Sequence, residues 1–151
     1  MLTLYLDADA CPVKEEAYRV AGRYSMPVIV VAKQTMWVPT NELITLKVCP
    51  GFEEVDDWIV EQAGYRDIVI TTDIPLAARC LAKNALVLNP KGYAFTDNTI
   101  GDALAMREIR DYQRQGQEGI QSGGPSSMTQ KDRSKFLAML DEMINKVRRA
   151  T

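Results

Sequence analysis

The sequence predicts an α/β fold, a three-layer sandwich with a central, mostly parallel sheet and an additional C-terminal helix. Short apolar runs rich in Val and Ile alternate along the chain with amphipathic segments of helical period. The segments between successive runs are long enough for the crossovers that parallel strands require. With 151 residues, the chain is long enough to form one domain with its own core.

The first half of the chain alternates strand-like and helix-like segments. The run PVIVVA is short and β-branched, as buried strands are, and Gly64 follows a segment of helical period as a helix stop. Residues 35–43 are predicted to form an irregular or hairpin connection. In chain order, the predicted elements are a strand over 2–6, a helix over 13–24, strands over 27–32 and 44–48, and a helix over 53–64.

The second half continues the alternation and ends in two helices. Pro75 suits the first turn of a helix, Asn98 is a typical helix cap, and Thr129 with Asp132 has the spacing of a capping box. In chain order, the predicted elements are a strand over 67–72, a helix over 75–84, a strand over 85–89, and helices over 98–115 and 131–151.

The composition predicts one domain over residues 1–114, a flexible loop over 115–130 and a C-terminal helix over 131–151. The loop is rich in Gly, Ser and Gln and has no apolar period. The last helix has an apolar stripe that must be buried, either on the parent domain or in a homodimer contact. The stripe consists of Phe136, Leu140, Met143, Ile144 and Val147.

The absence of histidine limits the possible chemistry. Without His, the chain cannot form a Ser-His-Asp triad, a Cys-His pair or a His-ligated metal site. The three Cys are widely spaced and form no CxxC pair, so buried free thiols are expected. A metal site in this chain would be built from carboxylate oxygens, which suit Mg²⁺ or Mn²⁺.

Aspartates follow two of the predicted strands. Asp7 ends the first strand, Asp9 lies in the loop beyond it, and Asp73 follows the strand over 67–72. Ligands of open α/β sheets bind at the carboxyl ends of the strands, so these three are the candidate catalytic residues. The alternative is a structural role, because Asp is common in turns and Asp73 is placed to cap the next helix.

Two further aspartates are candidate metal ligands together with Asp7 and Asp73. Asp56 lies at the border of the buried face of the helix over 53–64, whereas its acidic neighbours are expected in solvent. Asp97 precedes the helix over 98–115. Both could instead be ordinary acids of a first helical turn. Carboxylates gathered at one point are stable as anions mainly when a cation lies among them.

Basic side chains could bind a phosphate-bearing substrate beside such a cluster. The acids are concentrated in the first half of the chain and the bases in the second half. Lys14, Arg107 and Arg110 are the candidate substrate-binding residues, and Lys33 and Lys91 are also available. The alternative for the two arginines is a solvated helix face.

Four motifs resemble those of the YaiI/YqxD family of uncharacterised bacterial proteins: DADACPVK, VDDWI, VITTDIPLA, and GGP followed by TQKDRSKF. That family is similar to the PIN and NYN domains, many of which are metal-dependent ribonucleases with acids at the carboxyl edge of a parallel sheet. The resemblance implies a PIN-like fold, RNA as the substrate, and a magnesium or manganese site. Asp7, Asp56 and Asp73 match the first three acids of those domains, and Asp97 loosely matches the last.

Two other functions remain open. The Asp7-x-Asp9 pattern also resembles haloacid-dehalogenase-like phosphatases, in which the first Asp is the nucleophile and the second is a general acid. A non-catalytic RNA-binding module with a residual acid site is the third reading. No apolar run is long enough to span a membrane and the N-terminus lacks signal-peptide features, so a cytoplasmic protein is expected.

Overall fold

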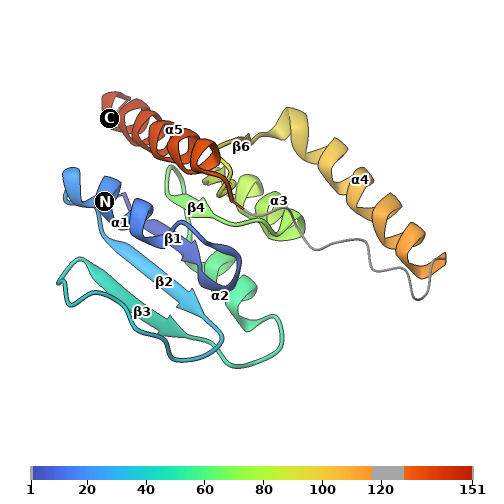
Figure 1. Ribbon diagram of the computed structural model, residues 1–151, viewed down its shortest axis with the longest axis horizontal. Helices are drawn as coiled ribbons and strands as arrows, with labels where there is room; N and C mark the ends of the chain where they lie inside the picture. The colour runs from blue at the N-terminus through green and yellow to red at the C-terminus, as the bar shows by residue number, and fades with distance from the viewer. Residues whose placement is uncertain (1, 117–127, 151) are drawn as a thin grey trace.

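Six strands form one sheet in the order β3-β2-β1-β4-β5-β6 (Figure 1). The computed structural model describes residues 2–116 and 128–150, and it describes the side chains of all of these except 111–116. The first five strands run parallel, and β6 is antiparallel to β5, which confirms the mostly parallel central sheet. The strands are β1 (Leu4–Asp7), β2 (Val28–Ala32), β3 (Ile44–Val48), β4 (Ile68–Ile70), β5 (Leu86–Leu88) and β6 (Ala94–Phe95).

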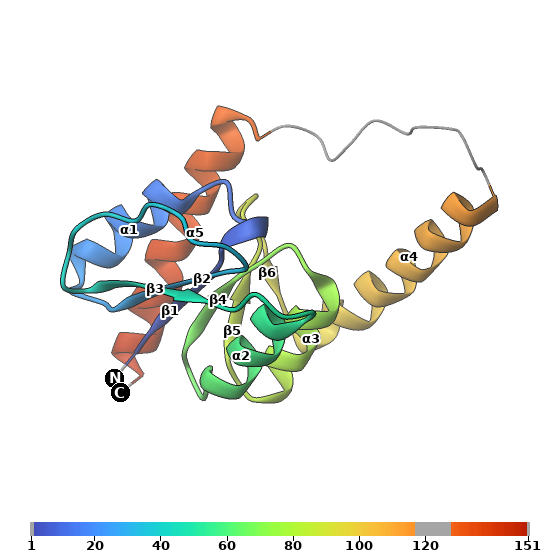
Figure 2. The same cartoon turned by 90° about the horizontal axis from the view of Figure 1, so that it is seen from below.

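Helices cover both faces of this sheet. The views in Figures 1 and 2 place α1 and α5 on one face and α2 and α3 on the other, which confirms the three-layer arrangement and the C-terminal helix. A short 3₁₀ turn, η1 (Ala8–Ala10), links β1 to the first helix. The helices are α1 (Lys14–Arg23), α2 (Glu54–Gln62), α3 (Ile74–Ala82), α4 (Asp97–Gly116) and α5 (Gln130–Arg149).

The alternation of side chains along β1 divides the apolar interior into two cores. Leu4 and Leu6 point to the face covered by α1 and α5, and Tyr5 points to the face covered by α2 and α3. Strands β2 and β4 are buried on both faces, which explains why their sequences are continuous apolar runs, whereas the edge strand β3 alternates between half-buried and exposed residues.

Helix α5 packs on its own domain through the predicted apolar stripe. Phe136, Leu140 and Ile144 are fully buried in the core beside α1. Polar contacts fix the same interface, because Arg133 Nη1 donates to Glu16 Oε2 at 3.1 Å and the Tyr24 hydroxyl donates to Asp141 Oδ1 at 2.5 Å. A stripe that is buried within the chain is not available for the predicted homodimer contact.

The start of α5 is fixed by the expected capping box. Thr129 Oγ1 accepts from the Asp132 backbone amide at 3.0 Å, and Asp132 Oδ2 accepts from the Thr129 amide at 3.1 Å. The helix therefore begins at Gln130, within the segment predicted as a loop over 115–130. Helix α4 ends at Gly116, and residues 117–127 of that predicted loop lie outside the described residues.

Helix α4 leaves the body of the domain after packing against α3 (Figures 1 and 2). Ile100, in its first turns, packs against the core on the α3 side, whereas Met106 and Ile109 are exposed. Among the helices that the structure describes, none is both long and apolar enough to span a membrane.

Candidate functional site

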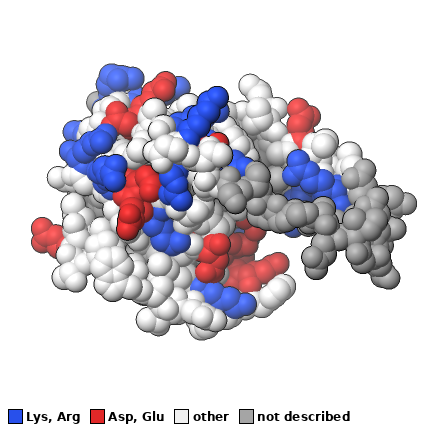
Figure 3. Space-filling model, viewed as in Figure 1, with Lys and Arg blue, Asp and Glu red and all other residues white. Residues whose placement is uncertain are grey.

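Two neighbouring cavities open at the carboxyl ends of the parallel strands. The first, which we call the acidic cavity, has a volume of about 410 Å³ and is lined by five carboxylates and Lys33. Figure 3 shows acidic side chains gathered in this region with a basic side chain beside them. The five acids are Asp7, Asp9, Glu53, Asp56 and Asp73.

Asp7 and Asp73 are brought together because β1 and β4 are adjacent parallel strands. Asp7 ends β1 with 6% of its surface exposed, and its Oδ2 accepts a hydrogen bond from Thr71 Oγ1 at 2.7 Å. The same Thr71 hydroxyl oxygen accepts from the Asp73 backbone amide at 2.9 Å. A continuous hydrogen-bonded chain therefore links the two strand ends and joins the Asp7 carboxylate to the backbone of Asp73.

The structural and functional readings of Asp73 are compatible. Its Oδ1 accepts from the Leu76 backbone amide at 2.9 Å, so Asp73 caps α3 as the sequence suggested. The side chain nevertheless lines the acidic cavity. Capping orients this carboxylate at the strand ends and leaves its other oxygen without a role in the cap.

Asp56 enters the cavity from the first turn of α2. Burial, together with the negative charges of Asp73 and Asp7, raises its pKa to about 6. The pKa of Asp7 is also raised, mainly by burial, although the hydrogen bond from Thr71 opposes the effect. The carboxylates from β1, α2 and the end of β4 are thus close enough to disfavour one another's ionisation.

Glu53 is a carboxylate of the cavity wall that the sequence analysis did not single out. It was expected on a solvated outer face, and its side chain is indeed exposed. Its backbone is in the left-handed region, with φ at 56°, and this turn places the residue beside the cavity. In the sequence, Gly51 indicates a tight turn before α2. A glycine does not, however, predict which way the side chains after the turn will point.

Asp57 is a useful contrast to its neighbour Asp56. It is exposed on the outer face of α2, as expected, and its Oδ1 accepts from Arg79 Nη1 at 2.9 Å. It does not line the acidic cavity. Two adjacent aspartates in one helix therefore have different surroundings, because successive helical residues point about 100° apart.

The donor set of the acidic cavity suits a hard divalent cation, since carboxylate oxygens are the ligands that Mg²⁺ and Mn²⁺ prefer. In the part of the chain that the structure describes, no three His, Cys, Asp or Glu side chains are already placed to hold a metal ion. Coordination would require the carboxylates to turn toward a common point. Asp9 and Glu53 are exposed, so their side chains have room for this movement.

The second cavity, which we call the lysine cavity, lies on the α1 side of the same edge and has a volume of about 560 Å³. Lys14 and Lys91 line it together with Asn89. Asp9 and Thr72 line both cavities, so the end of η1 forms the ridge between them. Lys14 Nζ donates to the Cys11 carbonyl at 2.7 Å, which positions this ammonium group at the start of α1.

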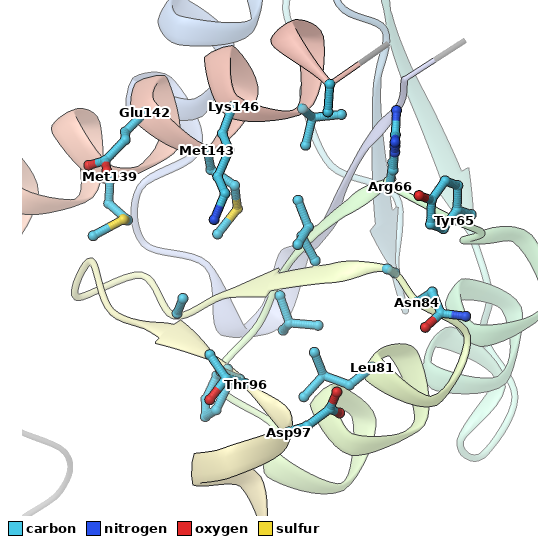
Figure 4. Close-up of a pocket in the computed structure, with 17 residues that line it drawn as sticks. Tyr65, Arg66, Leu81, Asn84, Thr96, Asp97, Met139, Glu142, Met143 and Lys146 are labelled. Carbon is cyan, nitrogen blue, oxygen red and sulfur yellow. The ribbon is translucent and has the colours of Figure 1, made fainter.

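Asp97 does not reach the acidic cavity. Strand β6 runs antiparallel to β5, so the residues after it return to the amino end of the parallel strands. Asp97 instead lines a cavity of about 540 Å³ at that opposite edge, with Arg66 and Tyr65 on one side and α5 on the other (Figure 4). The short β6, which the sequence analysis did not predict, accounts for this difference.

Arg107 and Arg110 are also separate from the strand ends. Both are exposed on α4, which projects away from the domain, and neither lines the acidic or the lysine cavity. Of the three predicted substrate-binding residues, only Lys14 is located beside the acid cluster.

All three cysteines are buried and free. Burial raises the pKa of the Cys11 thiol to about 11, so this residue beside the acids is not an activated nucleophile.

Comparisons with known proteins agree over almost the whole chain. A family model described as "Uncharacterized BCR, YaiI/YqxD family" matches residues 5–146. A UPF0178 protein of Nitrobacter winogradskyi is 49% identical over 150 residues, which cover 99% of this chain and 94% of that protein. The UPF0178 protein YaiI of Escherichia coli O81 is 46% identical over 152 residues, which cover 99% of each chain. No solved structure matches. The chain therefore belongs to the YaiI/YqxD family of uncharacterised proteins.

Proposed function

We propose that this protein is a divalent-metal-dependent ribonuclease whose active site is the acidic cavity. One observation supports this most directly: Asp7, Asp56 and Asp73, from three separate elements, line a single cavity at the carboxyl ends of the strands. Open α/β sheets bind their ligands at this edge. The resemblance of the sequence motifs to PIN and NYN domains implies the same reaction class. RNA in the cytoplasm is the proposed substrate.

In this proposal, Asp7, Asp56 and Asp73 hold Mg²⁺ or Mn²⁺, and Asp9 and Glu53 are auxiliary acids. A bound ion would supply activation of a water molecule and stabilisation of charge on a phosphoryl group. Thr71 keeps the Asp7 carboxylate fixed at the end of β1. The raised pKa values of Asp7 and Asp56 fit this assignment, because a cation among the carboxylates would relieve the repulsion between them.

A phosphatase with Asp7 as nucleophile has less support. The Asp7 carboxylate is almost completely buried, and one of its oxygens accepts from Thr71. Phosphatases of this kind also use a lysine downstream of the aspartates, and the candidates in this chain are Lys83 and Lys91. Lys83 donates to the carbonyls of Val60 and Glu61 on α2. Lys91 lines the same cavity as Asp9.

The decisive experiment compares Asp7→Asn and Asp73→Asn with the unchanged protein. Asn keeps an oxygen that can accept from Thr71 or cap α3, so both variants are expected to fold. We expect Mn²⁺-dependent cleavage of a single-stranded RNA by the unchanged protein, loss of cleavage in both variants, and weaker Mn²⁺ binding by calorimetry. Asp57→Asn is the matched control and should cleave normally.

The alternatives give different results in the same assays. A fluoroberyllate or phosphoryl adduct on Asp7, without RNA cleavage, would identify a phosphatase. RNA binding that survives both substitutions, with no turnover in any divalent metal, would identify a binding module. Absence of Mn²⁺ binding to the unchanged protein would refute the ribonuclease proposal.

A further inference from the structure

Phe52 is the most exposed large apolar side chain of the described residues, with 89% of its surface in solvent. It lines the acidic cavity, directly before Glu53 and in the same wall as Asp56. It belongs to neither apolar core. A single exposed apolar residue needs no special explanation. A functional role for Phe52 therefore requires further observations on its backbone and its neighbours.

The backbone around Phe52 is fixed in a tight turn. The Gly51 amide donates to Glu54 Oε2 at 3.0 Å, and the Glu54 amide donates to the Gly51 carbonyl at 3.2 Å. Glu53 has a positive φ of 56°, which is uncommon for a residue with a side chain. The turn continues into α2, where the Asp57 amide donates to the Glu53 carbonyl at 3.0 Å. Phe52 is thus presented at the cavity by a constrained backbone.

The lysine cavity lies across the ridge from this aromatic ring. Lys14 uses one of its three ammonium protons on the Cys11 carbonyl, and the other two can meet an anion. The strand ends therefore present an exposed ring and an acidic cavity on one side of Asp9, and lysines on the other. An aromatic face beside basic groups is the arrangement by which proteins hold single-stranded nucleic acid.

We infer that the site takes a single-stranded nucleic acid, with an unpaired base stacked on Phe52 and a neighbouring phosphate in the lysine cavity. This inference rests on the proposed function, because it assigns a substrate class to the same acidic cavity. A base can cover the exposed ring only when one of its faces is free. In a duplex, both faces of an internal base are covered by its neighbours, so duplexes should bind weakly.

The test is a binding titration of the full chain with a fluorescent single-stranded RNA, in EDTA so that no cleavage occurs. Removing a stacked aromatic residue weakens binding by about fivefold or more, so we expect at least this loss for Phe52→Ala. Phe52→Trp should restore the affinity, because it restores a ring. Tyr65→Ala is the matched control, since Tyr65 is 69% exposed at the opposite edge of the sheet and should bind normally.

Lys14→Gln tests the phosphate position separately. We expect weaker binding and a slope of log affinity against log salt that is smaller by about one. Phe52→Ala should leave this slope unchanged, because stacking releases no counterions.

Equal affinity of Phe52→Ala and the unchanged protein for the single strand would overturn the inference. Equal affinity of the unchanged protein for single strand and duplex would also overturn it. These results are independent of the ribonuclease test, because binding in EDTA needs neither metal nor turnover. Tight single-strand binding without Mn²⁺-dependent cleavage would refute the ribonuclease and support the binding inference.

Discussion

Replacing Asp56 by Asn is expected to stabilise the metal-free protein at neutral pH. In the folded protein, burial and the neighbouring acids raise the pKa of Asp56 from its ordinary value of 3.8 to about 6. A group whose pKa is raised by folding stabilises the fold below its unfolded pKa, and this stability is lost as the pH rises through the folded pKa. The loss therefore occurs between about pH 4 and pH 6, and Asn, which does not ionise, avoids it.

The size of the effect follows from the same pKa values. The difference between 3.8 and about 6 corresponds to about 3 kcal/mol in the free energy of unfolding. Because the Asp56 side chain is partly exposed, solvent screening reduces this value, and we expect a gain of about 1 kcal/mol for Asp56→Asn. The gain should be present at pH 7.5 and mostly absent at pH 4.

Urea unfolding in EDTA at both pH values measures this gain. Asp57→Asn is the control, because Asp57 is exposed and forms only a surface ion pair with Arg79. It should lose between 0 and about 1 kcal/mol and gain nothing at either pH. The reasoning is refuted if Asp56→Asn shows no gain at pH 7.5, or shows the same gain at pH 4.

Three further predictions concern the fold. Phe136→Ala should lower the free energy of unfolding by about 3–5 kcal/mol in urea titrations, because Phe136 is fully buried between α5 and the sheet; a loss below about 1 kcal/mol would show that α5 is not docked in solution. Gly92→Ala should cost about 1–3 kcal/mol in the same titration, since φ is +91° and the new Cβ would lie 2.8 Å from the backbone of Lys135 and Phe136; an unchanged midpoint would contradict this close approach. At pH 8, Cys11 and Cys80 should react with a thiol reagent only as fast as the protein opens, because burial raises both pKa values to about 11; rapid labelling of the native protein would contradict their burial.

The sequence was sufficient to predict most of the candidate site. Asp7 and Asp73 each follow a strongly apolar run, and parallel strands place all their carboxyl ends at one edge. This argument needs no knowledge of the strand order, and the structure places β1 and β4 side by side. Asp56 was found by helical periodicity, which separates it from the solvated Asp57.

The parts of the site that the sequence did not predict depend on structural features with weak local sequence signals. Strand β6 has two residues, too few for a period-two pattern, yet it reverses the chain and sends Asp97 to the opposite edge. The backbone of Glu53 is in the left-handed region, and the sequence does not predict this because Glu rarely adopts that conformation. The departure of α4 from the domain, which removes Arg107 and Arg110 from the site, is set by tertiary packing against α3.

The docking of α5 has a consequence for how the protein is made. Tyr24 and Asn145, which are hydrogen-bonded, lie 121 residues apart in the chain. During synthesis from the N-terminus, the face of the sheet beside α1 stays uncovered until α5 leaves the ribosome. Contacts between such distant segments form slowly, and an open apolar face favours aggregation in the meantime. Aggregation is therefore expected to threaten the nascent chain most just before α5, Gln130–Arg149, emerges.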